Sequence, residues 1–193
     1  MRKLNNPVYL FISLLVLFIL SVTAMAQDKS RLHYDSDDAK FEVKFGKSYN
    51  YDNIAVKRVV DGDTLLLENG ERVRLIGIDT PELHESKKLH RDSERSGQDL
   101  QTIQGMGRLA AEFTRNLVEG KRVRLEFDVD KHDKYGRILA YVYLVDDGTF
   151  VNAKIVEEGY ASLMTYPPNV KYADEFVKLY REARENNRGL WSK

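Results

Sequence analysis

Hydrophobic and polar residues alternate in short segments from residue 54 onward, a pattern that predicts β-strands. The segments 54–60, 64–67 and 72–78 are rich in Val, Ile and Leu, and Asp-Gly and Asn-Gly pairs separate them. Such pairs are typical of tight hairpin turns, so we predict a meander of three strands. The segments 122–127 and 138–145 are the predicted fourth and fifth strands.

Three further segments have the features of helices. Apolar residues recur at helical spacing over 106–118, where Gly120 follows as a stop signal, and a final helix is predicted over 172–186. We also predict a short helix that Asn152 caps. The polar, charged segment 83–104 is expected to be a long loop, and long loops tend to be functional or mobile.

Five strands with helices after the third and the fifth predict a mainly β protein with α-helices (α+β). A small antiparallel barrel of the OB type has this number of strands. In such a barrel, the ends of strands one to three lie beside the loop that precedes strand five.

The N-terminal residues 1–26 have the layout of a cleavable export signal. Arg2 and Lys3 precede the apolar run 8–22, and an Ala-x-Ala pattern ends at Ala26. We expect cleavage after Ala26 and a secreted or periplasmic mature chain. The alternative is an uncleaved membrane anchor, although the run is short against the roughly 20 residues that a spanning helix needs.

Residues 27–49 form a polar arm of mixed charge, and 50–193 are predicted to be a single barrel domain. No Cys is present, which excludes zinc-thiolate sites and Cys nucleophiles. The chain has 30 basic and 30 acidic residues, and loss of Arg2 and Lys3 with the signal leaves a small acidic excess. This balance counts against a protein that coats nucleic acid non-specifically, but it allows an enzyme with a local basic pocket.

Carboxylates occur at the ends of the predicted strands. Asp61 and Asp63 frame the first turn, and Asp79, Thr80 and Glu82 follow the third strand. Taken alone, Asp61-Gly62-Asp63 is better explained as an ordinary turn, and the segment 79–82 could be a strand exit with a helix cap. If the barrel curls so that the carboxylates converge, their mutual repulsion favours a hard divalent cation with oxygen ligands, Ca²⁺ or Mg²⁺ rather than zinc.

Two arginines lie near the same strand ends. Arg74 is within the third predicted strand, and Arg137 follows a glycine turn just before the fifth. Two planar guanidinium groups aimed at one point suit a phosphate, whereas each Arg alone is equally well part of a structural salt bridge. Together with metal carboxylates and a spare carboxylate, they make up the groups needed for phosphodiester hydrolysis.

These residues lie in motifs that resemble the staphylococcal (micrococcal) nuclease, or thermonuclease, family. The motifs are Val60-Asp61-Gly62-Asp63-Thr64, Arg74-Leu75-Ile76-Gly77-Ile78-Asp79-Thr80-Pro81-Glu82, Asp133-Lys134-Tyr135-Gly136-Arg137 and Leu139-Ala140-Tyr141. They occur in order and at compatible spacing, and the resemblance covers nearly all of the chain beyond the arm. It implies an OB-type barrel of five strands with about three helices.

The resemblance also implies how a metal is held and where a base lies. Asp63 and Asp79 would bind Ca²⁺ through their carboxylates, and Thr80 through its backbone carbonyl. Glu82 would act as the general base on a water near the metal.

The same resemblance assigns the contacts with substrate. Arg74 and Arg137 would grip the scissile phosphate, Lys134 and Tyr135 would contact a neighbouring terminal phosphate, and Tyr166 would belong to the nucleotide pocket. The family cleaves the 5′ P–O bond of DNA and RNA, with mixed endo- and exonuclease action, and leaves 3′-phosphate ends.

Departures from the family pattern bear on the substrate. Met164 stands where the family has the first of two pocket tyrosines, and the segment 83–104 is longer than in the family. The mature chain is also slightly acidic. His84, His90 and His132 lie in polar segments and are expected to be solvated rather than catalytic.

Besides a Ca²⁺-dependent nuclease, two alternatives stay open. One is a catalytically weak nuclease-like module that binds nucleic acid; it predicts missing carboxylates or arginines, and all of them are present. The other is a phosphodiesterase for short oligonucleotides, which the long segment after Glu82 keeps possible. We expect a monomer without a stable protein partner.

Overall fold

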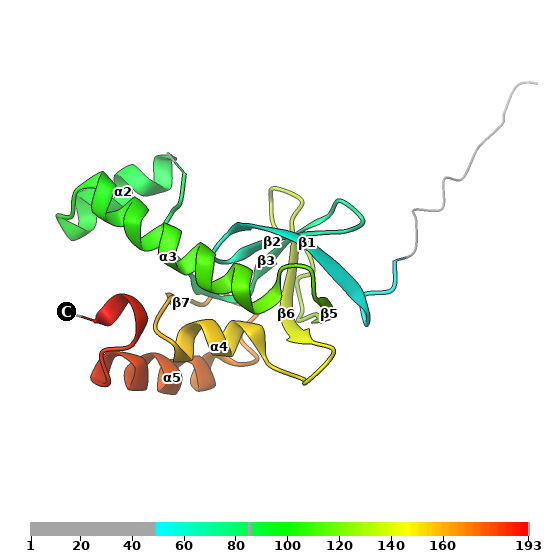
Figure 1. Cartoon of the computed structure of the whole chain (residues 1–193). Coiled ribbons are helices and arrows are strands. Elements are labelled where there is room, and N and C mark those ends of the chain that lie inside the picture. Colours follow the sequence, from blue (N-terminus) through cyan, green and yellow to red (C-terminus); the bar gives the residue numbers. More distant parts are fainter. Residues whose placement is uncertain (1–48, 85, 193) are drawn as a thin grey trace, which may run out of the picture. The chain divides into compact units, whose positions relative to one another are not determined.

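A closed barrel of five strands is the centre of the structure (Figure 1). The computed structural model describes residues 49–84 and 86–192, which belong to one compact unit, Lys47–Lys193. The predicted signal and all but the last residue of the predicted arm lie outside the described residues. Around the barrel the strands are β1 (Ile54–Asp61), β2 (Thr64–Leu67), β3 (Arg72–Leu75), β6 (Ile138–Leu144) and β5 (Arg122–Glu126), while β4 (Gly77–Asp79) pairs with β7 (Ser162–Met164) outside it.

The structure confirms the predicted α+β barrel, with one difference in strand direction. Four barrel pairings are antiparallel, whereas β3 and β6 run parallel and pair Val73 with Ile138 and Arg74 with Leu139. Strands that alternate strictly in direction can close a ring only in even numbers, so a closed barrel of five strands needs a parallel pair. The antiparallel expectation therefore does not hold at this seam.

The third predicted strand, 72–78, is interrupted at Ile76, which separates β3 from β4. Gly77 follows with φ +83°, and a Cβ atom at this position would collide with the Phe176 ring, so both the bend and the close contact require glycine. Beyond the bend, β4 leaves the barrel and pairs with β7, a strand that the sequence pattern did not predict. The interruption thus redirects the chain just before Asp79.

Four α-helices lie within residues 49–84 and 86–192, one more than the resemblance implied. They are α2 (Lys87–Ser96), α3 (Leu100–Val118), α4 (Val151–Glu157) and α5 (Ala173–Glu185), and a 3₁₀ turn, η2 (Gly189–Trp191), follows. In Figure 1, α3 extends from α2 to the barrel, and α4 and α5 lie side by side. Within the described part of the chain, no helix is long and apolar enough to cross a membrane.

The prediction of a long loop over 83–104 is wrong, because α2 and the first turn of α3 occupy most of that segment. Ser86 caps α2 by accepting a hydrogen bond from the Leu89 backbone N–H, and Gly97 ends the helix in a left-handed conformation. Leu89 is the one apolar residue of α2 and is fully buried. A single apolar residue gives no stripe at helical spacing, so the pattern could not reveal this helix.

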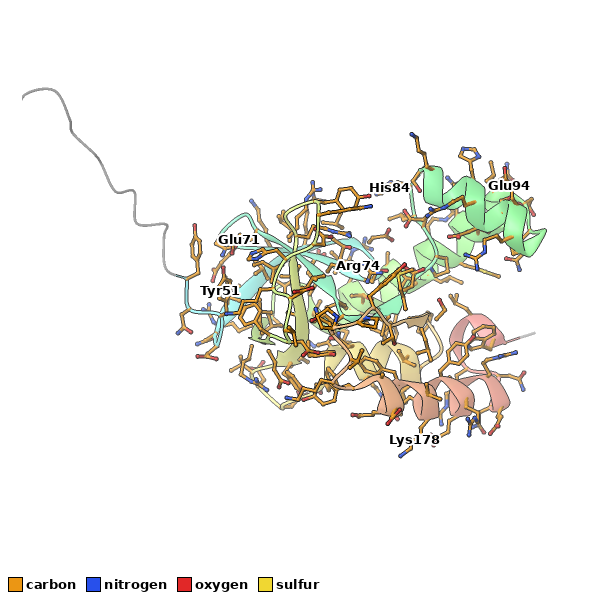
Figure 2. The ribbon with its side chains drawn as sticks, turned by 180° about the vertical axis from the view of Figure 1, so that it is seen from behind. Tyr51, Glu71, Arg74, His84, Glu94 and Lys178 are labelled. Atoms are coloured by element: carbon orange, nitrogen blue, oxygen red, sulfur yellow. The ribbon has the colours of Figure 1, made fainter. Side chains whose placement is uncertain are left out.

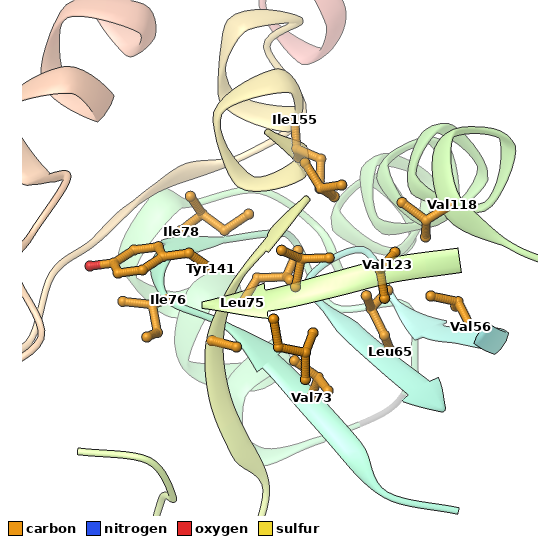
Figure 3. Packing of buried hydrophobic residues seen from close by; sticks show 14 of the residues in the cluster. Val56, Leu65, Val73, Leu75, Ile76, Ile78, Val118, Val123, Tyr141 and Ile155 are labelled. Atoms are coloured by element: carbon orange, nitrogen blue, oxygen red, sulfur yellow. The ribbon is translucent and has the colours of Figure 1, made fainter. Parts of the chain in front are cut away.

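Apolar side chains that alternate along the strands fill the barrel (Figure 3). Leu65, Leu67 and Val73 have no exposed surface, and Leu75 and Tyr141 have 1%. Each Å² of apolar surface removed from water stabilises the fold by roughly 25 cal/mol. The tightly packed core therefore makes the barrel rigid, and the strand ends and turns of the barrel carry the polar groups of the site.

Asn152 does not cap α4, contrary to the sequence-based expectation. It is the second residue of that helix, whose N-cap is Phe150. Its fully buried side chain accepts a hydrogen bond from the Val142 N–H (3.0 Å) and donates one to the Ile76 carbonyl (2.9 Å). Asn152 thereby gives a partner to a carbonyl located where the strand is interrupted.

We expect Asn152→Leu to lower the free energy of unfolding by about 3 kcal/mol, because the buried N–H of Val142 and carbonyl of Ile76 lose their partner. Urea denaturation followed by circular dichroism measures the change, and Asn50→Leu at an exposed position is the control. A loss below about 0.5 kcal/mol for Asn152→Leu would show that this side chain does not support the interruption.

Candidate active site

Arg74 lies between two acidic side chains from different parts of the barrel. Its Nη2 atom is 3.2 Å from Asp63 Oδ2 and 2.9 Å from Asp79 Oδ1. The three side chains are largely buried, with exposed fractions of 12% for Arg74, 7% for Asp63 and 16% for Asp79. The structure therefore confirms that the carboxylates at the ends of the second and third predicted strands converge.

The guanidinium group of Arg74 is held by the bend that follows β3. Its Nη1 atom donates hydrogen bonds to the carbonyls of Leu75 (2.9 Å) and Ile78 (2.8 Å). The Sδ atom of Met164, at the end of β7, lies 3.9 Å from Nη2. Figure 2 labels Arg74 near the middle of the domain as seen from that side, and these contacts fix the direction of its planar group.

Asp63 is clamped to the end of β4 by hydrogen bonds. Its Oδ2 atom accepts from the backbone N–H (2.9 Å) and the hydroxyl (3.2 Å) of Thr80. A Cβ atom on Gly62 would lie 2.8 Å from Thr80 Oγ1, so glycine allows this close approach. From α3, the Thr114 hydroxyl donates to the Gly62 carbonyl (2.7 Å). The first turn is therefore positioned from two sides.

The donor set of this cluster fits a hard cation. The Asp63 and Asp79 carboxylates and the Thr80 carbonyl offer only oxygen atoms, which Ca²⁺ and Mg²⁺ prefer. Two carboxylates face one guanidinium group, so the cluster accommodates further positive charge. No group of three or more His, Cys, Asp or Glu side chains that could hold a metal occurs within residues 49–84 and 86–192. A cation here would thus depend on two carboxylates, the carbonyl and other ligands.

Glu82 lies two residues beyond Thr80 and is positioned by two helices. The Ser86 hydroxyl donates a hydrogen bond to its Oε2 atom (3.3 Å), and the same hydroxyl caps α2. A Cβ atom on Gly107 of α3 would lie 2.5 Å from the Glu82 carbonyl oxygen, so this helix packs directly on the Glu82 backbone. The proposed base is therefore attached to the scaffold through its side chain and its backbone.

A second group of polar residues lies in the loop before β6. Arg137 Nε donates to Asp133 Oδ2 (2.7 Å), and Asp133 Oδ1 accepts from the backbone N–H groups of Tyr135 and Arg137, both at 2.9 Å. The Lys134 ammonium and the Arg137 guanidinium lie 5.1 Å and 5.6 Å from the Tyr135 ring centroid. Burial opposes ionisation of Asp133, but the hydrogen bonds from Arg137 and Tyr135 outweigh it and hold the pKa of Asp133 below its usual value.

The parallel seam relates the two groups. Arg74 of β3 pairs with Leu139 of β6, and Arg137 comes two residues before Leu139 in the sequence. The structure thus gathers Asp63, Asp79, Thr80 and Arg74 into one cluster, and Lys134, Tyr135 and Arg137 into another beside the same pair of strands.

Tyr166, the remaining residue that the sequence assigned to the site, follows β7. Its side chain is 70% exposed, and its backbone carbonyl accepts a hydrogen bond from Asn169 N–H (3.0 Å). The exposed ring is available for stacking, whereas Met164 two residues earlier contacts Arg74.

Sequence reasoning missed the residues that support the site: Ser86, Gly107, Thr114 and Asp133. A glycine inside a helical pattern signals close packing, so Gly107 could have been noticed. The spacing of Asp133 and Arg137 also permits a local ion pair. The Thr114 hydroxyl and the Gly62 carbonyl are far apart in the sequence, so no local sequence pattern predicts their hydrogen bond.

Comparison with known proteins finds one family and several relatives. The family model described as staphylococcal nuclease homologue matches residues 72–193. The chain is 36% identical over 163 residues to a thermonuclease of Staphylococcus intermedius, covering 83% of this chain and 88% of the relative. It is 34% identical over 175 residues to endonuclease YncB of Bacillus subtilis, covering 88% and 76%. A Methanocaldococcus jannaschii protein named as uncharacterised, MJ1439, is 32% identical over 196 residues, covering 95% and 94%.

The lowered pKa of Asp133 makes a prediction about pH and stability. The ionised carboxylate stabilises the fold above the ordinary pKa of Asp, about 3.9, and this contribution is lost as the pH falls through the lower folded-state pKa. We expect Asp133→Asn to be less stable than wild type at neutral pH and to approach wild-type stability below about pH 4. Urea midpoints across this range measure the difference. A difference that stays constant with pH would contradict a role for the carboxylate charge.

Proposed function

Because the chain belongs to the staphylococcal nuclease family and is a nuclease that hydrolyses phosphodiester bonds, we propose that its reaction depends on Ca²⁺, acts on DNA and RNA, and leaves 3′-phosphate ends. The observation that carries the proposal is the buried contact of Arg74 with Asp63 and Asp79. Oxygen ligands for a hard cation and a guanidinium group for a phosphate lie within ion-pair distance of each other there.

Asp63, Asp79 and the Thr80 carbonyl hold the Ca²⁺ in this proposal. Bound there, the ion supplies positive charge that stabilises the phosphate in the transition state. The protein keeps these oxygens in place through the hydrogen bonds between Asp63 and Thr80 and through the close approach at Gly62. Prearranged ligands of this kind need little reorganisation during the reaction.

Arg74 and Arg137 bind the scissile phosphate and neutralise the charge that develops on it. The planar guanidinium fork matches phosphate oxygens, and both groups have fixed orientations. Backbone carbonyls of the bend hold Arg74, and Asp133 holds Arg137. Arg137 also serves the leaving oxygen in this proposal.

Glu82 takes a proton from the attacking water. A carboxylate is suited to this role when it lies within hydrogen-bond reach of the water, about 3 Å. The Ser86 hydroxyl and the packing of Gly107 on the backbone limit the positions that this carboxylate adopts. In this proposal the proton leaves the water for a carboxylate whose position is limited by Ser86 and Gly107.

Lys134, Tyr135 and Tyr166 extend the contacts with substrate. Lys134 and Tyr135 lie together on the exposed loop and contact a neighbouring phosphate. The exposed Tyr166 ring stacks on a base, while Met164 offers no ring, which makes base contacts weaker than two tyrosines would.

The proposal includes export and a monomeric state. The layout of residues 1–26 supports a signal that is cleaved after Ala26, which would release the enzyme outside the cytoplasm. A catalytically weak binding module has less support, since its expected losses of carboxylates and arginines are absent from the sequence. A phosphodiesterase for short oligonucleotides differs from the proposal in substrate length, which a cleavage assay reveals.

We expect the purified mature chain to digest DNA and RNA with Ca²⁺ and to stop when a chelator removes the ion, because the buried carboxylates then repel the phosphate. Gel analysis of the products, with activity restored by added Ca²⁺ as the control, measures this. Digestion that continues unchanged in chelator would contradict the role of the metal. An absence of digestion with every divalent cation would favour the binding module.

We expect Glu82→Gln and Arg137→Ala each to lower kcat by about 100-fold or more, because one removes the base and the other a phosphate contact. Glu94→Gln in α2 and Arg181→Ala in α5, which change charge at exposed positions, are the matched controls. Circular dichroism checks that the barrel remains folded. Rates equal to wild type in folded Glu82→Gln or Arg137→Ala would refute the role assigned to that residue.

A further inference from the structure

A hollow of about 640 Å³ opens beside Arg137. Its walls come from the turn between β2 and β3 and from the loop before β6, and their charged and aromatic residues are Glu71, Arg72, Tyr135 and Arg137. Two glycines, Gly70 and Gly136, line it without side chains and leave it open. The volume is sufficient for a phosphate group with part of its sugar.

Arg72 contributes an exposed positive charge to the hollow. Its side chain is exposed, and within the described ranges 49–84 and 86–192 it forms no ion pair. The neighbouring carboxylate of Glu71 accepts hydrogen bonds from the Tyr51 hydroxyl (2.7 Å) and Asn69 Nδ2 (2.6 Å) (Figure 2). Glu71 is thus directed to these partners rather than to Arg72.

The strand register places Arg72 in line with the phosphate-binding arginines. Val73 and Leu75 point into the core, so Arg72 and Arg74 belong to the outer face of β3. The parallel pairing begins at Val73 and Ile138, so Arg72 and Arg137 each directly precede a paired residue, and both line the hollow. A phosphodiester backbone that passes Arg74 and Arg137 therefore reaches Arg72 next.

The position also agrees with the general way in which OB-type barrels bind oligonucleotides. They use the face of strands two and three together with the loop between strands one and two and the loop between strands four and five. In this chain, Asp63 lies in the first of these loops and Tyr135 in the second, and Arg72 lies on the face between them.

We propose that the hollow is a further phosphate subsite, in which Arg72 binds the phosphodiester next to the one held by Arg137. This inference rests on the proposed nuclease function and deepens it: the enzyme prefers strands long enough to reach Arg72 over dinucleotides. Arg72 is a binding residue here and has no part in proton transfer.

The test compares two arginines on the same face of the barrel. Arg58 of β1 and Arg72 of β3 both pair with Leu66 of β2, and both are exposed, but only Arg72 lines the hollow. Binding of a fluorescein-labelled ten-nucleotide oligothymidylate and of a thymidine dinucleotide is measured by fluorescence anisotropy in chelator, at several salt concentrations. Cleavage of the same probes with Ca²⁺ is measured separately.

We expect Arg72→Ala to weaken binding of the ten-nucleotide probe by about five- to tenfold, because a charge-assisted contact with phosphate is lost. The slope of log affinity against log salt should fall by about 0.7, the value for one phosphate contact on a single strand. Binding of the dinucleotide should not change. Arg58→Ala should change the affinity for the ten-nucleotide probe by less than about twofold.

The outcomes separate the subsite from the proposed function. Equal losses in Arg72→Ala and Arg58→Ala would overturn the subsite, since they would show a general effect of surface charge. Wild-type affinity in Arg72→Ala would overturn it as well. Failure of the wild-type chain to cleave either probe would reject the nuclease assignment of the site, while a selective binding loss in Arg72→Ala would still support the phosphate subsite.

Discussion

The ion pairs of Arg74 with Asp63 and Asp79 are the interaction on which the rest of the site depends. A buried charge is costly unless an opposite charge and hydrogen bonds compensate it, and removal of one partner leaves the others uncompensated. Here one guanidinium nitrogen lies within 3.2 Å of both carboxylates, so the loss of Arg74 would leave two buried acids facing each other. The same arrangement retains an excess of negative charge, because two carboxylates face one guanidinium group, and this excess favours the cation that we propose to bind there.

The interruption of the third strand gives this cluster its geometry. In a continuous strand the carbonyls would accept hydrogen bonds from the neighbouring strand, whereas the bend leaves carbonyls that need other partners. Arg74 donates to those of Leu75 and Ile78, and Asn152 donates to that of Ile76. Two polar side chains thus stabilise a bend that turns Asp79 toward Arg74. The same bend therefore interrupts the third strand and places Asp79 in the site.

The sequence predicted the parts of the fold that depend on local signals. Turn glycines and alternating apolar residues identified the barrel strands. The motif residues identified Asp63 and Asp79 as converging carboxylates and Arg74 as a phosphate ligand, and in the structure Arg74 forms ion pairs with both carboxylates. It did not predict α2, which depends on its caps and on burial of Leu89 against the rest of the fold. It assigned Asn152 to a cap because the preference of Asn for helix ends is local, whereas its hydrogen bonds to two strand segments are not. The contacts of Asn152 and Thr114 join segments far apart in the chain, whereas the Ser86 cap of α2 and the Asp133–Arg137 ion pair are local.

One face of α3 connects the two halves of the proposed chemistry. Gly107 packs on the Glu82 backbone, and Thr114 donates to the Gly62 carbonyl in the turn that carries Asp63. These two helix residues are seven apart and therefore lie on the same face, about 10 Å from each other along the axis. Because a helix is stiff over two turns, it sets the separation between the segment of Glu82, the proposed base, and the turn of Asp63, a proposed metal ligand. A rigid helix behind the site thus fixes the distance between these two segments. At both contacts α3 approaches backbone closely, through a glycine without a side chain at Gly107 and a short hydroxyl side chain at Thr114.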